Sequence, residues 1–501
     1  MTQNNDWDLV VVGGGTSGSI VARRAVDAGW RTLLIEAGGS NRTDAIQDVG
    51  KLNTLWHSSM DWDYHTVPQP HAASRRLHLP RGRVLGGSHS LNAAIWVRGA
   101  ASDYDGWAEQ GAEGWSWAEV EPIFRRIERR LGTEDPRRGR SGLLPITDNE
   151  PLHPVQRAIV DAAVQAGLPV NRDYNVGDQE GVSIQQVTIE HADRVTTWDA
   201  YAQPAVDDAR LVVRTGTLVH RVTFEHARAT GVRLDSGEVI TARNVVLSAG
   251  ALGSAELLLR SGVGPAGHLG RLGIPVIADL PVGDNLHDHY LVPVVFSTAR
   301  EIAPPEPHRS ATQTHWFWRS DPALEVPDTQ PICFSVPMLE PGMDPLPWGF
   351  SLMAGIVTTR SRGTLRLAGP DRRDGVLIDP HVLEDERDVA AMLASVKQCL
   401  DVGAQPALSG RWGARPHAPG AGLSDEELVG YIRGRVVTYH HQVGTCRMGT
   451  DSHAVVDPQL RVRGVAGLRV ADASVMPTIT TGNTNAPSAM IGERAASLLL
   501  A

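Results

Sequence analysis

Gly13-Gly14-Gly15-Thr16-Ser17-Gly18 is the stretch that decides the fold, because it has the spacing G-x-G-x-x-G. In a strand-turn-helix unit each glycine of this pattern meets a separate demand. Gly13 permits the tight turn, Gly15 lets the backbone approach a pyrophosphate, and Gly18 lets the helix pack closely on the strand. The N-terminus of the helix then faces the anion. The stretch therefore predicts a site for nucleotide phosphates.

The sequence on either side predicts a β-α-β unit. Leu9–Val12 is an apolar run, Ser17–Ala28 has a helix-like pattern, and a second apolar run covers Thr32–Ile35. Glu36 follows at the end of the second predicted strand, where a carboxylate can bind the ribose hydroxyls of a dinucleotide. The alternative is a glycine-rich turn in an unrelated unit. It does not account for a strand, a helix, a strand and an acid in register.

Composition limits the possible functions of the chain. Its 501 residues correspond to about three domains of ordinary size, or to one large interrupted domain with an insert. The net charge is −10, and acidic and basic residues are interspersed, so we expect no nucleic-acid partner. The three cysteines, Cys333, Cys399 and Cys446, form no C-x-x-C pair. We therefore expect neither a disulfide framework nor a metal site.

Targeting signals are not evident in the sequence. The first residues, Met1–Asp8, lack the basic region of a signal peptide. No apolar run approaches the length of about 18 residues that a membrane helix needs. We expect no membrane span and a cytoplasmic protein.

A second glycine-rich region follows a long irregular segment. From Asn41 to His78 regular periodicity is lost and aromatic residues cluster, which is typical of an ordered excursion over a ligand. The region Arg81–Gly99 then contains a Gly-Gly-Ser turn that opens a run of small and apolar residues. This pattern indicates backbone packed tightly against a flat group.

At this point the chain resembles the glucose-methanol-choline (GMC) oxidoreductases, which are FAD-dependent enzymes. Four further groups of residues carry the resemblance to both ends of the chain: Asp103–Trp107 with Gly114–Trp117 and Pro122–Phe124, Gly250–Ala255 with Leu257–Gly264, Pro281–Leu286 with Asp288–His289, and His441–Gly449. One departure is Ala255, where the family usually has proline. It lies at a predicted helix start and leaves the chemistry untouched.

The resemblance implies an α/β fold (α+β overall) with two domains. One is a Rossmann-like FAD-binding domain, discontinuous in sequence, and the other a substrate-binding domain with an antiparallel sheet flanked by helices. We assign 1–150, 195–290 and 435–501 to the first domain, and 151–194 and 291–434 to the second. In the second domain the patterns predict strands around Pro331–Leu339 and Gly349–Thr359, and a helix with Val389, Leu393 and Val396 on one stripe.

The expected cofactor is FAD. A buried flavin needs small side chains along its rings in addition to the phosphate turn, and the second glycine-rich region supplies them. The resemblance places these residues against it: Gly13, Gly15, Thr16, Ser17, Gly18, Glu36, Gly87, Ser88, Asn92, Ala93, Ile95, Val219, Ala249, Asp472, Ala473, Asn483 and Thr484. His89 could be considered as a covalent anchor. Family members with a histidyl flavin carry histidine directly before the asparagine, where this chain has Leu91, so we expect non-covalent FAD.

The resemblance assigns the catalytic roles to His441 and Asn483. The family's base lies three residues before a glycine, and this spacing selects His441 over His440, which is expected to shape the pocket or simply to pack. Counting from Ser474, Asn483 falls where the family has its second catalytic residue. An asparagine cannot titrate, so it can only orient and hydrogen-bond the substrate oxygen. The alternative for Asn483 is an ordinary turn residue.

The predicted reaction is oxidation of an alcohol to an aldehyde or ketone, in which His441 accepts the hydroxyl proton and the carbinol carbon passes hydride to flavin N5. Transferring a proton from an alcohol of pKa about 16 to a histidine of pKa about 6.5 is uphill by about 13 kcal/mol. A turnover of about 10 per second allows a total barrier of about 16 kcal/mol. The charge on oxygen must therefore be stabilised by Asn483 and the site, or the two transfers must overlap.

Substrate and electron acceptor are less determined by the sequence. We expect Trp96 and His440 to line the pocket together with aromatic residues of the middle domain, which favours an apolar or aromatic primary alcohol over a sugar. Either O₂ or a quinone-type acceptor can reoxidise the flavin. Three alternatives are a hydroxynitrile lyase on the same scaffold, a flavin-binding protein without catalysis, and an NAD(P)-linked dehydrogenase. The last explains only the first 40 residues.

Overall fold

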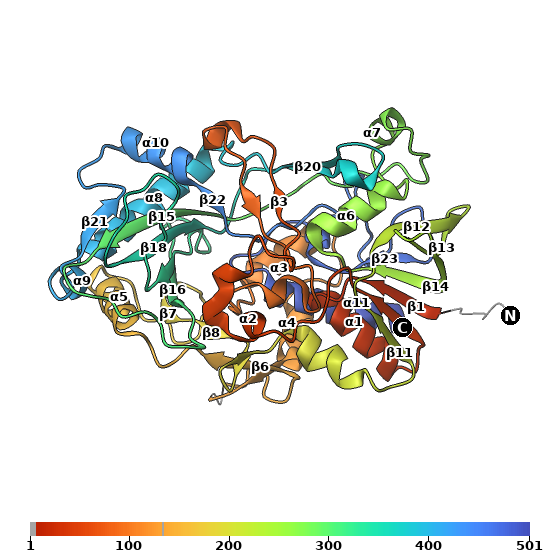
Figure 1. The fold of residues 1–501 in the computed structure, drawn as a ribbon, viewed down its shortest axis with the longest axis horizontal. Coiled ribbons are helices and arrows are strands. Elements are labelled where there is room, and N and C mark those ends of the chain that lie inside the picture. Colours follow the sequence, from red (N-terminus) through yellow and green to blue (C-terminus); the bar gives the residue numbers. More distant parts are fainter. Residues whose placement is uncertain (1–6, 133–134) are drawn as a thin grey trace.

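The computed structural model describes residues 7–132 and 135–501. Figure 1 shows an elongated molecule with β1, β14 and α1 toward one end and β15, β18 and α8 toward the other. Residues 1–6, on which the prediction about a signal peptide partly rests, lie outside the described residues.

The first sheet contains the predicted β-α-β unit. Its order is β11-β2-β1-β14-β13-β12, and β23 pairs with β14. Neighbours among β11, β2, β1, β14 and β23 are parallel, whereas β12 and β13 form an antiparallel extension. The strands are β1 Trp7–Val12, β2 Thr32–Ile35, β11 Leu211–Arg214, β12 Val219–Glu225, β13 Arg228–Leu234, β14 Val239–Leu247 and β23 Leu468–Val470. This is the α/β domain that the sequence predicts.

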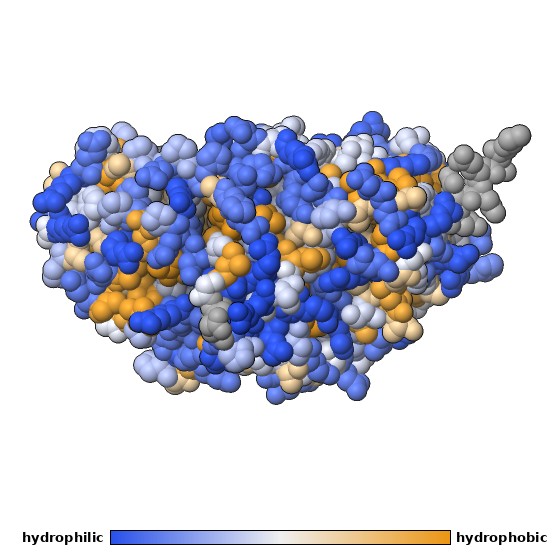
Figure 2. All heavy atoms as spheres, turned by 90° about the horizontal axis from the view of Figure 1, so that it is seen from below, coloured by the Kyte–Doolittle hydropathy of each residue, from blue (hydrophilic) through white to orange (hydrophobic). Residues whose placement is uncertain are grey.

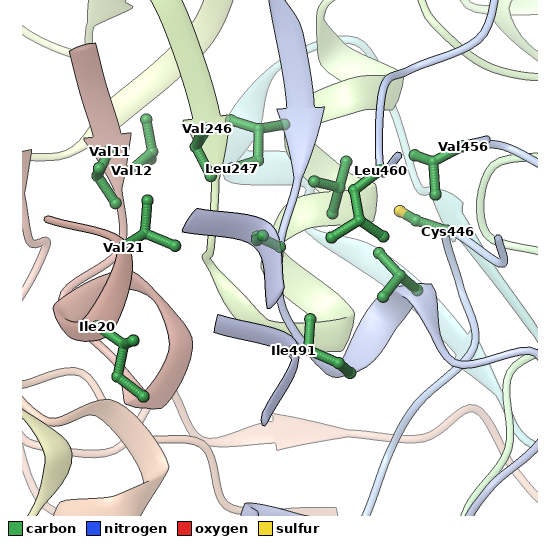
Figure 3. Packing of buried hydrophobic residues seen from close by; sticks show 14 of the residues in the cluster. Val11, Val12, Ile20, Val21, Val246, Leu247, Cys446, Val456, Leu460 and Ile491 are labelled. Atoms are coloured by element: carbon green, nitrogen blue, oxygen red, sulfur yellow. The ribbon is translucent and has the colours of Figure 1, made fainter. Parts of the chain in front are cut away.

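Two helices from opposite ends of the chain pack together. Figure 3 shows Ile20 and Val21 of the first helix and Ile491 of the last in one hydrophobic cluster with strand residues such as Val246. Helix α1 covers Thr16–Asp27 and α11 covers Asn485–Leu500. Their backbones are close: a Cβ added at Gly492 would lie 2.9 Å from the Cα atom of Ser17. The Ser17 hydroxyl donates to the Ser488 carbonyl at 2.7 Å, and Arg24 pairs with the buried Glu493 at 2.7 Å. The last segment of the chain is thereby held beside the first.

The second sheet is antiparallel and has helices packed against it. Its order is β21-β15-β18-β17-β16-β7, and β22 pairs with β15. The strands are β7 Gly181–Ile184, β15 Tyr290–Ser297, β16 Thr312–Phe317, β17 Ile332–Phe334, β18 Gly349–Ile356, β21 Arg415–Ala418 and β22 Val437–Thr438. The helices nearby are α5 Pro154–Gln165, α8 Glu386–Ala404, α9 Pro406–Ser409 and α10 Asp425–Arg435. An antiparallel sheet flanked by helices is the arrangement predicted for the substrate-binding domain.

The remaining elements lie outside the two sheets. The helices are α2 Asp44–Gln47, α3 Ala101–Glu109, α4 Trp117–Ile127, α6 Gly250–Arg260 and α7 Ala266–Arg271, and the strands are β3 Tyr64–His65, β4 His78–Leu79, β5 Glu128–Arg130, β6 Leu144–Asp148, β8 Gln186–Val187, β9 Ile189–Glu190, β10 Asp193–Arg194, β19 Thr364–Leu367 and β20 Val376–Asp379. Short segments of 3₁₀ or π helix occur among them.

Two strand predictions in the second sheet were too long. β17 ends at Phe334 rather than Leu339, and Pro337, which has no N–H to donate to a ladder, lies in the excess. β18 ends at Ile356 rather than Thr359. The division into domains stays a prediction, and β22, which we assigned to the FAD-binding domain, pairs with β15 of the second sheet.

A buried network of charges fixes the segment that runs between the sheets. Arg98 and Arg138 both contact the Glu128 carboxylate, at 2.6 and 2.9 Å. Burial opposes ionisation of Glu128, but the two guanidinium groups prevail and hold its pKa at about 2. The indole of Trp96 donates to the same carboxylate at 2.8 Å. The chain directly before Arg98 is thereby held in one position.

The surface shown in Figure 2 is mostly hydrophilic, with hydrophobic residues in separate patches. Within 7–132 and 135–501, no helix combines the length and the apolar character that crossing a membrane requires.

Asp103 provides a test of how the loop before α11 is held. Its carboxylate accepts hydrogen bonds from the backbone N–H of Thr481 at 2.7 Å and of Ala100 at 2.8 Å, and burial raises its pKa to about 6. An ionised Asp103 therefore lowers stability progressively as the pH rises from about 4 to above 6. Asp103→Asn keeps the acceptor oxygen and removes the buried charge.

The free energy of unfolding of Asp103→Asn minus that of the wild type should rise by about 1 kcal/mol between pH 5 and pH 8, because only the wild type loses stability as Asp103 ionises. Urea unfolding at the two pH values measures this difference, with Asp103→Ala as the variant that loses the acceptor altogether. A difference that does not change with pH would contradict the assignment.

Candidate active site

A cavity of about 650 Å³ lies between the two sheets and is lined by segments from the start, the middle and the end of the chain. The nucleotide side is formed by the glycine-rich turn, by the start of α6 and by the start of α11. The opposite side is formed by strands of the second sheet. A ligand in this cavity would therefore contact both halves of the molecule.

The phosphate cradle is formed by two backbone segments in close approach. Gly13 has φ +103°, and a Cβ there would lie 2.4 Å from the carbonyl oxygen of Ser248. Gly87 has φ +56°, and a Cβ there would lie 2.8 Å from the Cα atom of Gly15. Side chains at either position would displace the walls of the cavity. The N-terminus of the twelve-residue helix α1 opens toward the same space, which suits an anion.

Glu36 lies at the end of β2 and lines the cavity. Its two carboxylate oxygens accept hydrogen bonds from Gly14 N at 2.9 Å and Gly38 N at 2.8 Å. Burial raises its pKa, and these hydrogen bonds act in the opposite direction. Each oxygen can accept a further bond, so the geometry permits contact with ribose hydroxyls.

Asp472 joins the end of β23 to the start of α6. Its carboxylate accepts hydrogen bonds from Gly250 N at 2.9 Å, Ser474 N at 2.8 Å and the Ser254 hydroxyl at 2.5 Å. Burial is the largest influence on its pKa and raises it. The adjacent Ala473 also lines the cavity.

The structure brings together nearly all the residues that the sequence predicts for cofactor binding. Those that line the cavity are Gly13, Gly15, Thr16, Ser17, Glu36, Gly87, Ser88, Asn92, Ala93, Ile95, Val219, Ala249, Asp472, Ala473, Asn483 and Thr484. The exception is Gly18. A Cβ there would lie 2.0 Å from the Gly13 carbonyl oxygen, so this glycine permits the turn to pack on α1 without lining the cavity.

The side chains of His89 and Asn92 are fixed in different directions. His89 is fully buried outside the cavity lining, with Nε2 2.9 Å from the Thr188 hydroxyl and Nδ1 accepting from Thr197 N at 3.3 Å. The Asn92 oxygen accepts from Ala94 N at 2.9 Å and from Arg194 at 3.0 Å. The Asn92 amide nitrogen is then the group that remains to donate to a ligand.

His441 and Asn483 are in direct contact at the wall of the cavity. The Asn483 amide nitrogen lies 3.1 Å from Nε2 of His441, although the two residues are 42 positions apart in the chain. Gln330 donates its amide N–H to the Asn483 oxygen at 3.0 Å. The Asn483 oxygen is therefore an acceptor, and its nitrogen donates to Nε2 of His441. In this arrangement Nε2 is unprotonated and can act as a base.

Asp288 positions the backbone of His441. Its carboxylate accepts from His441 N at 2.8 Å and from His289 N at 2.9 Å, and it also accepts from the side chain of Gln442. Burial raises the pKa of Asp288 to about 7, against the opposing effect of these hydrogen bonds. The Tyr439 ring stacks on the His441 ring with centroids 4.5 Å apart. The imidazole is thereby restricted in position and in tilt.

The other ring nitrogen of His441 faces a second histidine. Nδ1 of His289 lies 3.0 Å from Nδ1 of His441, so one of the two nitrogens must carry the proton. Burial lowers the pKa of His289 to about 3 and that of His441 well below its ordinary value of 6.5. Both rings are therefore neutral at pH 7, and His441 with an unprotonated Nε2 donates from Nδ1 to His289.

His440 lines the cavity but is turned away from this pair. Its Nδ1 lies 2.8 Å from the Thr438 hydroxyl, and the Trp56 ring packs edge-on with centroids 5.1 Å apart. The Arg81 guanidinium donates to the His440 carbonyl oxygen. Burial lowers the pKa of His440 to about 3. These contacts suit a residue that shapes the wall.

Sequence reasoning missed several groups of this site. Asp288 and His289 stood only in a loop typical of the family, without an individual role. Gln330 and its neighbour His315 gave no signal, because neither lies in a recognisable motif. Gln330 contacts Asn483 and His315 contacts Gln330, and both contacts depend on how the chain around β16 and β17 brings distant segments together.

The prediction for Trp96 was wrong. Trp96 is fully buried, its indole is directed at Glu128, and it does not line the cavity. The aromatic residues Trp316, Phe317 and Phe350 are likewise buried in the core, and Trp348 is 40% exposed. From the second sheet the cavity is lined by Leu291, Ile332, Phe334, Met353, Val437 and Thr438.

A histidine and aspartate cluster at the cavity lining was not anticipated, since we predicted no metal site. His57, Asp63 and His78 have donor atoms within 4.8 Å of one another. Nδ1 of His57 lies 2.7 Å from Asp63, and the two histidine rings stack with centroids 3.9 Å apart and planes 24° apart. Nearly parallel stacked rings do not direct their nitrogen lone pairs at one point. The cluster is thus arranged for hydrogen bonding in this structure.

Models of a known protein family match segments of the chain that line both sides of this cavity. Two family models described as GMC oxidoreductase match residues 7–291 and 359–492. The chain belongs to the GMC oxidoreductase family. The resemblance seen in the motifs is thereby confirmed.

Relatives of this GMC oxidoreductase extend over almost its full length. It is 36% identical to the mitochondrial choline dehydrogenase of Mus musculus, over 99% of this chain and 89% of that protein. It is also 36% identical to an oxygen-dependent choline dehydrogenase of Rhizobium etli, over 98% of this chain and 95% of that protein. The structure of pyridoxine 4-oxidase from Mesorbium loti superposes with a TM-score of 0.94 at 34% identity, covering 98% and 99% of the two chains.

The cavity residues fit FAD, the cofactor expected of the family. Gly15 and Gly87 line the cavity with backbone alone, which leaves room for a pyrophosphate, and Glu36 can accept further bonds from a ribose. Asn92 has an amide nitrogen that would donate to the flavin. When bound, FAD supplies the acceptor for two electrons and a proton, which amino-acid side chains lack.

The low pKa of His441 predicts the pH dependence of flavin reduction. A base with a pKa below 6.5 is neutral at pH 7, and its activity is lost only as the pH falls through that lower pKa. We expect the rate constant for flavin reduction by an alcohol to stay level from pH 8 to about pH 6.5 and to fall in more acidic buffer. Anaerobic rapid mixing measures this profile. A fall centred above pH 7 would contradict the assigned state of His441.

Proposed function

We propose that this GMC oxidoreductase oxidises apolar primary alcohols to aldehydes with non-covalently bound FAD. The observation that carries the proposal is the 3.1 Å contact between Nε2 of His441 and the amide nitrogen of Asn483 at the wall of the cavity. One group is a base and the other a hydrogen-bond donor. An alcohol needs both at its hydroxyl if the carbinol hydrogen is to leave as hydride.

The two side chains divide the work at the substrate oxygen. A hydroxyl that faces both groups takes the place of the Asn483 amide at Nε2 of His441, donates its proton to Nε2 and accepts a hydrogen bond from that amide. As the O–H bond weakens, negative charge grows on the oxygen, and the amide stabilises it in a water-poor site. FAD held in this cavity by residues such as Gly87, Ser88 and Asn92 would supply the acceptor for the hydride of the carbinol carbon.

His289 stabilises the protonated form of His441. Once Nε2 has accepted the substrate proton, Nδ1–H of His441 still donates to Nδ1 of His289 across 3.0 Å. A hydrogen bond from a charged donor contributes about 1.5–3 kcal/mol. This bond offsets part of the cost of forming an imidazolium in a buried site.

The proposed substrate class follows from the second sheet. The cavity-lining residues contributed by β15, β17, β18 and β22 are uncharged, and all but Thr438 are apolar. A cation against these strands would lose its hydration, which is unfavourable. The carboxylate in this part of the lining, Glu340, lies beyond β17 and already has Arg75 and Arg435 beside it. Although the relatives named above include choline dehydrogenases, we therefore propose an uncharged aliphatic or aromatic alcohol for this chain.

Non-covalent attachment is supported by His89, whose ring is held by Thr188 and Thr197 outside the cavity. Acid precipitation tests it, because non-covalent FAD should remain in the supernatant and covalent FAD should precipitate with the protein.

An anaerobic panel of alcohols tests the function. We expect bleaching of the oxidised flavin by benzyl and medium-chain primary alcohols, and much less bleaching by choline or glucose at equal concentration. Readmission of air then shows whether O₂ or only a quinone-type dye restores the oxidised spectrum. A flavin that no alcohol reduces, in an enzyme that cleaves cyanohydrins, would instead show the lyase alternative.

Substitution of the catalytic pair should lower the rate of flavin reduction without loss of FAD. We expect Asn483→Ala to lower it by about 10²-fold or more, because one donor to the developing charge is removed. We expect His441→Gln to lower it by about 10²- to 10⁴-fold, because the base is removed. The control is His308→Gln, an exposed histidine remote from the cavity lining. An unchanged rate in either active-site variant would remove the role assigned to that residue.

A further inference from the structure

Five buried side chains form a continuous hydrogen-bonded chain through the active site. In order they are His315, Gln330, Asn483, His441 and His289, and each neighbouring pair lies 3.0 or 3.1 Å apart. Gln330, His315 and His289 are fully buried. The chain begins in the second sheet, where His315 belongs to β16, and ends at the loop before β15.

Gln330 occupies a special place in this chain because its amide nitrogen contacts both neighbours. The nitrogen lies 3.0 Å from Nδ1 of His315 and 3.0 Å from the Asn483 oxygen. An amide NH₂ group has two hydrogens and accepts none, so both neighbours must be acceptors. The Gln330 oxygen has no partner in the described part of the chain. Gln330 therefore donates to both neighbours, and the direction of the hydrogen bonds toward His441 is set at Gln330.

The orientation of the Gln330 amide determines which ring nitrogen of His441 carries the proton. An Asn483 oxygen that accepts from Gln330 leaves the Asn483 nitrogen to face His441. Nε2 of His441 must then be an acceptor, its proton lies on Nδ1, and Nδ1 donates to His289. Reversing the amide of Gln330 reverses every later bond, so that Nε2 of His441 carries the proton and donates it to the Asn483 oxygen. Both arrangements form the hydrogen bonds between the five side chains, but only the first leaves Nε2 of His441 unprotonated and able to act as a base.

We propose that Gln330 is a positioning residue that holds the Asn483 amide and the His441 tautomer in the order required for alcohol oxidation. The inference rests on the proposed function, since it assumes that His441 is the base. It adds that the readiness of this base is decided by a residue which does not contact the substrate oxygen.

Gln330→Glu tests the proposal because a carboxyl changes from donor to acceptor when it ionises. While protonated, the introduced carboxyl can donate to the Asn483 oxygen and preserve the productive order. Once ionised, the same group can only accept, which draws the Asn483 nitrogen toward it and turns the Asn483 oxygen to His441. The variant should therefore lose activity as the pH rises, whereas the wild type should not.

We expect the rate constant for anaerobic flavin reduction in Gln330→Glu to fall by about 10²-fold through the ionisation of the introduced carboxyl. Gln330→Leu removes the donor without adding a charge, so we expect a fall of about 5- to 10-fold that is independent of pH. Gln156→Glu is the matched control, because Gln156 is also fully buried in the second domain but contacts Thr314 and Cys333 instead of the active site. It should keep the wild-type pH profile.

The outcomes separate this inference from the proposed function. If no alcohol reduces the flavin of the wild type, the proposed function fails. If the wild type is reduced but Gln330→Glu shows no loss at high pH, or Gln330→Leu has the wild-type rate, only the role of Gln330 is overturned. FAD content and melting temperature are recorded for each variant.

If the Gln330 variants do not bind FAD, a measurement on the wild-type enzyme still tests the proposal. ¹⁵N NMR of histidine-labelled holoenzyme, with the His441 signal assigned from His441→Gln, reports which ring nitrogen carries the proton. The proposal expects an unprotonated Nε2 and a protonated Nδ1 at pH 8. A protonated Nε2 in the resting enzyme would overturn it.

Discussion

The packing of α1 against α11 is the contact on which the rest of the site depends. It joins residues from the two ends of the chain through the Ser17–Ser488 hydrogen bond and the Arg24–Glu493 ion pair. It also leaves no space for a side chain at Gly492. Because α1 begins at the phosphate turn and α11 begins directly after Asn483 and Thr484, the same packing sets the distance from nucleotide to catalytic pair. A shift between the helices would move both ends of the cofactor site relative to each other.

Burial decides the chemistry of the groups that this packing brings together. His441, His440 and His289 are all driven toward the neutral state, which is the state a base must have before it accepts a proton. In the proposed mechanism the cost appears after proton transfer to His441, when an imidazolium must exist in the same environment. The Nδ1 contact with His289 and the developing charge on the substrate oxygen both offset this cost. The site therefore depends on hydrogen bonds of fixed direction rather than on a fixed counter-charge.

Sequence reasoning could predict the fold and most of the cavity wall, because glycine spacing, strand periodicity and family motifs are local patterns. Glu36 and the glycines of the turn follow from such patterns, and His441 and Asn483 follow from the family resemblance. Gln330 and His315 could not be found in this way, since their importance arises only when β16, β17 and the loop before α11 meet. Trp96 was misplaced because an aromatic residue beside a glycine-rich motif can face either the ligand or the core, and the partner that decides it, Glu128, lies 32 residues further on.

The proposed function requires that the cavity hold an alcohol with its oxygen in hydrogen-bond reach of His441 and Asn483, and that its carbinol C–H bond break when FAD is reduced. Anaerobic flavin reduction by benzyl alcohol and by its α-dideuterated form tests this most directly. The account predicts that deuterium at the carbinol carbon slows bleaching of the flavin in the wild-type enzyme, because that C–H bond breaks as the flavin is reduced. Bleaching at equal rates with the two alcohols, or no bleaching with either, would contradict it.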